Sequence, residues 1–88
     1  MARSFALPEI MDLASAGSIY AALTALRGDD VEIDASHVQT AGGLGLQILL
    51  AANKAWTRDG RTFRIVSPAA PFNDSCRLVG VDLPGISQ

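Results

Sequence analysis

Glycine and proline residues divide this chain into short and long apolar segments that alternate. The short segments lie at 4–7, 31–35 and 62–66, and the last two alternate apolar with polar residues, as a β-strand with one covered face does. Pro8 closes the first segment, which suits a strand end because proline lacks a backbone donor. The pattern therefore predicts three strands, each followed by a longer segment.

The longer segments carry apolar residues three and four positions apart, which predicts helices. The first helix is expected over 13–26, with Asp12 as its N-cap and Gly28 just beyond its end. A loop of small residues follows at 36–45, then a helix over 46–59 that ends at Gly60. A turn at 68–71, a last helix over 72–79 and a tail containing Pro84 complete the pattern.

The order strand, helix, strand, helix, strand, helix is typical of an α/β fold, because parallel neighbours need a crossover of helical length. Each helix shows a single apolar stripe. We therefore expect one domain with a single sheet of about four strands, in which one strand can differ in direction, and helices chiefly on one face. Trp56 and Cys76 are expected to pack in its core.

Composition excludes several classes of function. Nine acidic and seven basic residues are scattered along the chain, and the absence of a basic run argues against nucleic-acid binding. A single cysteine forms no intrachain disulfide, and no cysteine and histidine pair has metal-ligand spacing. We expect no metal and no cofactor. No apolar run reaches the length of a bilayer span or resembles a signal peptide, so a cytoplasmic location is expected.

Catalytic groups are also sparse. The one histidine, His37, has no nucleophile elbow and no orienting acid beside it, so a solvated turn residue is the simpler interpretation. Asp12, Asp34 and Asp59 all lie at ends of predicted elements, where carboxylates commonly accept from free backbone N–H groups. The sequence thus predicts no catalytic residue and a protein that is not an enzyme.

The most unusual segment is TAGGLG at 40–45, directly before the second helix. Its glycines allow positive φ angles and close backbone approach, but the segment matches neither the phosphate-loop nor the dinucleotide pattern. It is either a tight turn or a surface on which another protein docks. Leu44 favours docking, because a large apolar side chain at an exposed helix start can serve as an anchor.

These segments resemble a STAS domain of the anti-sigma-factor antagonist type over about residues 5–83. The resemblance rests on VEIDASHV at 31–38, GLQILLAA at 45–52, the strand at 60–66 and LVGV at 78–81. In that family the second helix opens with a serine or threonine that a partner kinase phosphorylates. An ungapped register places Gly43 at this acceptor, so the usual hydroxyl is absent, and phosphorylation of Thr40 would require a shifted register.

The resemblance implies a non-enzymatic signalling module, similar to small stand-alone STAS proteins that accompany chemotaxis histidine kinases. The alternatives are an anti-sigma-factor antagonist controlled by phosphorylation and a cytoplasmic STAS subunit of a lipid-transport ATPase. Residues 36–52 contain no charged side chain, as the centre of an interface often does. The expected partner-binding residues lie in the loop and the first helical turn: Ser36, His37, Thr40, Gly42, Gly43, Leu44 and Gln47. The sequence does not decide whether the chain forms a homo-oligomer.

Overall fold

The computed structural model describes residues 2–80 and 83. Three strands, β1 (Arg3–Ala6), β3 (Val31–Asp34) and β5 (Phe63–Val66), form a parallel sheet in the order β1-β3-β5. A separate pair of two-residue strands, β2 (Ile10–Met11) and β4 (Thr40–Ala41), is also parallel. Three helices complete the described part: α1 (Leu13–Ala25), α2 (Gly43–Arg58) and α3 (Ala70–Val79). The tail expected around Pro84 lies outside the described residues.

The α/β class predicted from the segment order is confirmed, and the details of the sheet differ. The main sheet has three strands rather than about four, and every strand pair among the described residues is parallel. The short pair falls partly within the segment expected to be a loop. Helix α2 begins at Gly43 and α3 at Ala70, earlier than expected, because neither helix start has a side-chain cap that marks it.

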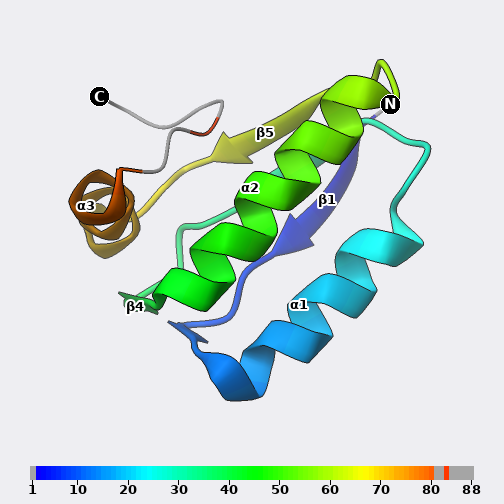
Figure 1. Cartoon of the computed structure of the whole chain (residues 1–88). Coiled ribbons are helices and arrows are strands. Elements are labelled where there is room, and N and C mark those ends of the chain that lie inside the picture. The colour runs from blue at the N-terminus through cyan, green and yellow to red at the C-terminus, as the bar shows by residue number, and fades with distance from the viewer. Residues whose placement is uncertain (1, 81–82, 84–88) are drawn as a thin grey trace.

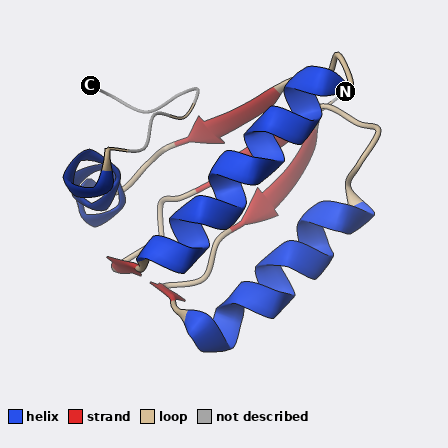
Figure 2. Ribbon diagram, viewed as in Figure 1, coloured by secondary structure: helices blue, strands red, loops and turns tan. Residues whose placement is uncertain are grey.

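Helices α1 and α2 lie side by side over one face of the main sheet, whereas α3 lies past the carboxyl end of β5 (Figures 1 and 2). This face of the sheet supplies buried side chains from β3 and β5: Val31, Ile33, Phe63 and Ile65. The residues between them, Glu32 and Arg64, point to the other face and are at least partly exposed. The alternation of apolar and polar residues is therefore the two-sided pattern of a half-covered sheet.

The helices complete the core from their apolar stripes. Ile19 and Leu23 of α1, Leu46 and Leu49 of α2, and Phe72 of α3 are almost fully buried. Trp56 and Cys76 are also buried, which confirms the packing roles predicted for them. Burial raises the pKa of the Cys76 thiol, so this side chain is a neutral packing group.

The predicted N-cap of α1 is confirmed as a capping box. Asp12 Oδ1 accepts from the Ser15 N–H at 3.0 Å, and Ser15 Oγ accepts from the Asp12 N–H at 3.0 Å. Gly28 and Gly60, which were expected to follow helix ends, adopt left-handed φ angles of 98° and 72°. Asp59 does not cap backbone donors: its carboxylate instead accepts from the Arg27 guanidinium.

Candidate functional site

The short β2–β4 pair brings the starts of α1 and α2 to the same end of the molecule. The Glu9 carbonyl accepts from the Gln39 and Thr40 N–H groups at 2.7 and 3.0 Å. The Met11 carbonyl accepts from the Gly42 N–H at 2.8 Å. Each helix begins two residues after its short strand, so these few hydrogen bonds set the position of one helix start relative to the other.

Three glycines, Gly42, Gly43 and Gly45, lie at the start of α2, and Met11 leaves no room for a side chain at two of them. A Cβ at Gly42 would lie 2.9 Å from the Met11 carbonyl oxygen, and one at Gly45 would lie 3.0 and 3.2 Å from Met11 side-chain atoms. Gly43 has open space around it. None of the three adopts a positive φ angle, although such angles were one expectation for this loop. The other expectation was a close approach to the backbone, and the group that approaches is Met11 of the same chain. Gly43 alone is free to carry a side chain.

The loop between β3 and β4 begins with a compact turn. Asp34 Oδ1 accepts from the Ser36 N–H at 2.9 Å, and Ser36 Oγ lies 3.2 Å from His37 Nδ1. The hydroxyl and the backbone N–H of Ser36 lower the pKa of the Asp34 carboxyl, and the proximity of His37 acts in the same direction. This arrangement orders the turn. Asp34, Ser36 and His37 do not line the groove between α1 and α2, so they are not arranged there as a nucleophile and a base.

We expect Ser36→Ala to raise the pKa of Asp34 towards its ordinary value, because the variant lacks the hydroxyl that favours the carboxylate. A lowered folded-state pKa stabilises the fold at neutral pH, and this stabilisation is lost as the pH falls through that pKa. The variant should therefore lose less stability on acidification than the wild type. An NMR titration of the Asp34 carboxyl would measure the shift, with Ser4→Ala on the sheet as control. An unchanged pKa in Ser36→Ala would show that the hydroxyl has no such effect.

The residues expected to bind a partner all lie where β3 ends and α2 begins. Ser36, His37, Thr40, Gly43 and Gln47 are exposed, and Gly42 is partly buried. Leu44 is 48% exposed despite its size. We call this set of seven residues the docking loop. The structure places its members on one continuous segment at one end of the helical layer.

Sequence reasoning missed two apolar residues that lie at the same end. Ile10 in β2 is 54% exposed, and Leu13 at the start of α1 is 79% exposed. Ile10 is the strand partner of Thr40, about thirty positions away in the chain. Strands of two residues are too short to give a periodic signal, so nothing in the sequence indicated this pairing.

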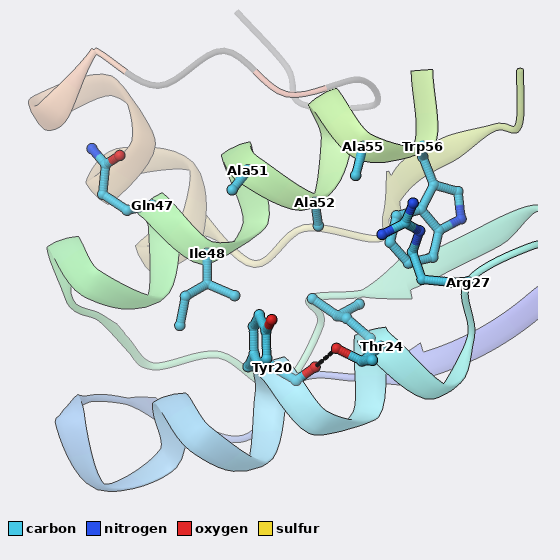
Figure 3. A pocket seen from close by; sticks show the side chains of 10 residues that line it. Tyr20, Thr24, Arg27, Gln47, Ile48, Ala51, Ala52, Ala55 and Trp56 are labelled. Atoms are coloured by element: carbon cyan, nitrogen blue, oxygen red, sulfur yellow. Dashed lines mark hydrogen bonds between the residues drawn. The ribbon is translucent and has the colours of Figure 1, made fainter. Parts of the chain in front are cut away.

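A groove between α1 and α2 was also not predicted. It has a volume of about 290 Å³ and a mostly apolar lining, into which Tyr20 and Ile48 project from opposite helices (Figure 3). Trp56 and Arg27 close the groove at the end where α2 finishes. The residues that line it are Tyr20, Leu23, Thr24, Arg27, Gln47, Ile48, Ala51, Ala52, Ala55 and Trp56.

The closed end of the groove is held by a cluster around Trp56. The indole N–H donates to the Asp29 carbonyl at 2.8 Å, and the ring packs at 59° to Phe63 with centroids 5.7 Å apart. The Arg27 guanidinium lies 5.6 Å from the indole centroid and forms an ion pair with Asp59 at 2.8 Å. These contacts join the end of α2 to the segment between α1 and β3.

Within residues 2–80 and Leu83, no group of three or more His, Cys, Asp or Glu side chains is placed to hold a metal ion. No helix in this part of the chain is long and apolar enough to cross a membrane.

Comparison with known proteins identifies the domain. A family model described as "Mlab, STAS domain" matches residues 5–85. The comparisons with curated proteins and with solved structures found no match. The family match confirms the domain resemblance carried by the sequence motifs, and STAS domains are in general non-enzymatic modules that bind partner proteins. Because the match covers nearly the whole sequence, the chain belongs to the STAS domain family.

Proposed function

We propose that this protein is a non-enzymatic signalling module that binds a chemotaxis-type histidine kinase or a related kinase through the docking loop. The observation that supports this most is Leu44, a large apolar side chain that is half exposed at the start of α2. Around it, residues 36–53 contain no charged side chain. Charge depletion and an apolar anchor together are what the centre of a protein interface requires.

The docking loop would act without the phosphorylation switch of an anti-sigma-factor antagonist. Gly43, the first residue of α2, carries no hydroxyl, although the space around it could accommodate a side chain. Thr40 has a hydroxyl, but it lies in β4, two residues before the helix N-cap. Binding would therefore be constitutive or controlled by the partner, and phosphorylated Thr40 is the weaker alternative.

A second candidate partner is a lipid-transport ATPase. Some small STAS proteins that serve as cytoplasmic subunits of such transporters resemble this chain in size. The family description names Mlab and no kinase, which keeps this candidate open. The two candidates share the docking loop and differ in the protein that it contacts.

We expect Leu44→Asp to weaken partner binding by at least about 2 kcal/mol, roughly thirtyfold, because it places a carboxylate at the anchor position. Tagged wild-type and Leu44→Asp chains would be used in parallel as baits in the native cell, with Ser4→Asp on the sheet as a matched control. Mass spectrometry would identify proteins that the wild type and the control recover and Leu44→Asp does not.

The identity of the recovered protein discriminates between the candidates. A histidine kinase supports the first proposal, and a transport ATPase supports the second. The intact mass of the recovered bait provides a further readout, since a phosphate on Thr40 would favour the anti-sigma-factor antagonist. Equal recovery of the partner by a folded Leu44→Asp variant would contradict the role of the docking loop.

A further inference from the structure

The outward side of the α1 and α2 layer is free of charge over most of its length. Residues 13–26, which include all of α1, contain no charged side chain, and residues 36–53 contain none either. Three large apolar side chains are nevertheless exposed on these helices: Leu13 at 79%, Tyr20 at 65% and Leu44 at 48%. Exposed apolar residues that gather on one face commonly mark an interaction surface.

These residues form two stripes that flank the groove. Leu13, Gly17, Tyr20 and Thr24 are separated by four, three and four positions, so they lie along one side of α1. Leu44, Ile48, Ala51 and Ala55 repeat this spacing on α2. We call these eight residues the α1–α2 face. Because four of them are glycine, alanine or threonine, the face has a hollow between projecting leucine and tyrosine side chains.

Charged side chains lie at the two ends of this face and differ in sign. Glu9 and Asp12 lie at the end where both helices start. Lys54 and Arg58 lie in the last turns of α2, at the opposite end. The face is thus apolar along its length, acidic beyond one end and basic beyond the other.

Acidic groups near the basic end already have partners within the chain. Asp59 pairs with Arg27, and Asp29 lies 3.6 Å from Arg3. The Asp30 carboxylate accepts from the Thr62 N–H at 2.8 Å. The two ion pairs compensate the charges of Asp59 and Asp29 inside each molecule, whereas Asp30 keeps its charge, so Lys54 and Arg58 leave this end with a positive excess.

We propose that a second copy of this chain covers the α1–α2 face, related by a two-fold axis that lies in the plane of the interface and runs perpendicular to the helix axes. In this arrangement the helices of the two copies run antiparallel, so the end of each copy that carries Glu9 and Asp12 lies over the end of the other that carries Lys54 and Arg58. A two-fold interface must be self-complementary, and this face satisfies that condition in charge as well as in apolar character. Tyr20, which is 65% exposed beside the groove, would be covered by the other copy.

The available area is sufficient for such a dimer. The Cα atoms span 29 × 28 × 19 Å, and the accessible surface is 4993 Å². One broad side of a body with these proportions carries about 1,000 Å², and a stable interface of standard size buries roughly 800 Å² per partner. Leu44 belongs to both surfaces, so a protein that binds the docking loop would compete with the second copy.

Analytical ultracentrifugation of the purified chain tests this inference. The wild type is expected to change from one chain mass, 9.2 kDa, to twice that mass as the concentration rises through the micromolar range. Ala51→Glu should raise the dissociation constant of the dimer by at least about a hundredfold, because each copy would bury an unpaired carboxylate. Ser18→Glu introduces the same charge on the side of α1 away from Tyr20, and it should leave dimerisation unchanged.

The two-fold arrangement has its own test. Arg58→Glu should weaken the dimer by placing like charges together, and adding Glu9→Lys should restore it. A wild type that stays monomeric at every concentration would overturn the proposal, as would equal weakening by Ala51→Glu and Ser18→Glu. If Glu9→Lys does not restore the dimer of Arg58→Glu, while the wild type still dimerises and Ala51→Glu still weakens the dimer, the antiparallel arrangement is overturned. These measurements use the isolated chain with Leu44 intact, so they are independent of partner binding through the docking loop.

Discussion

Replacement of Trp56 by alanine is expected to lower the free energy of unfolding by about 3 to 5 kcal/mol. The indole is 2% exposed, packs against Phe63 and donates its N–H to the Asp29 carbonyl. Alanine would leave a cavity at the end of α2, an unpaired carbonyl and an Arg27 guanidinium without the ring beneath it. Since small domains have a total stability of about 5 to 15 kcal/mol, this single change would bring the fold close to its limit.

Urea denaturation followed by circular dichroism would measure the effect of Trp56→Ala, because the variant lacks the fluorescent side chain. Trp56→Phe is the matched control: it keeps an aromatic ring and loses the hydrogen bond, so a smaller loss of about 1 to 2 kcal/mol is expected. Equal losses in the two variants would assign the stabilisation to the hydrogen bond alone. A loss below 1 kcal/mol in Trp56→Ala would contradict the packing role.

Gly42→Ala is expected to destabilise the protein by about 1 to 3 kcal/mol, as overpacking of a rigid contact does. The added methyl group would lie 2.9 Å from the Met11 carbonyl oxygen, which itself accepts the Gly42 N–H. Neither the carbonyl nor the glycine can move without breaking this hydrogen bond. The substitution should therefore separate β2 from β4 and displace the starts of α1 and α2.

Gly43→Ala is the control for Gly42→Ala, because open space surrounds the neighbouring glycine. It should be neutral or slightly stabilising, since alanine reduces the conformational freedom of the unfolded chain. Thermal unfolding would give the stability of both variants, and amide chemical shifts of residues 10–13 would report the displacement. Equal destabilisation by the two substitutions would mean that the loop needs glycine for flexibility and not for the Met11 contact.

The architecture of the domain could be predicted from the sequence because its signals are local and periodic. The alternation in Val31 to Asp34 and in Phe63 to Val66 indicated half-covered strands, and the spacing in α1 and α2 indicated helices with one buried side. Asp12 was recognisable as an N-cap because a carboxylate before an apolar helix acts within three residues of itself. Each of these features depends only on near neighbours in the chain.

The candidate site could be predicted only in part. The docking loop was visible as a glycine-rich, uncharged segment, but the reason for its glycines was not. Gly42 and Gly45 are small because Met11, about thirty residues earlier, lies against them. Ile10, Leu13 and the groove were missed for the same reason, since each becomes part of a surface only after β2 and β4 pair.

The sequence by itself determined the fold class, the helix and strand segments, the STAS resemblance and the absence of charge around Leu44. Local propensity and the period of the apolar pattern are sufficient for these, because they act between residues a few positions apart. Only the tertiary structure decided that the starts of α1 and α2 lie together, that Gly43 alone among the three glycines at 42–45 has space for a side chain, and that two uncharged stripes flank one groove. Those features depend on contacts between segments distant in the chain, and a periodic pattern contains no information about which distant segments meet.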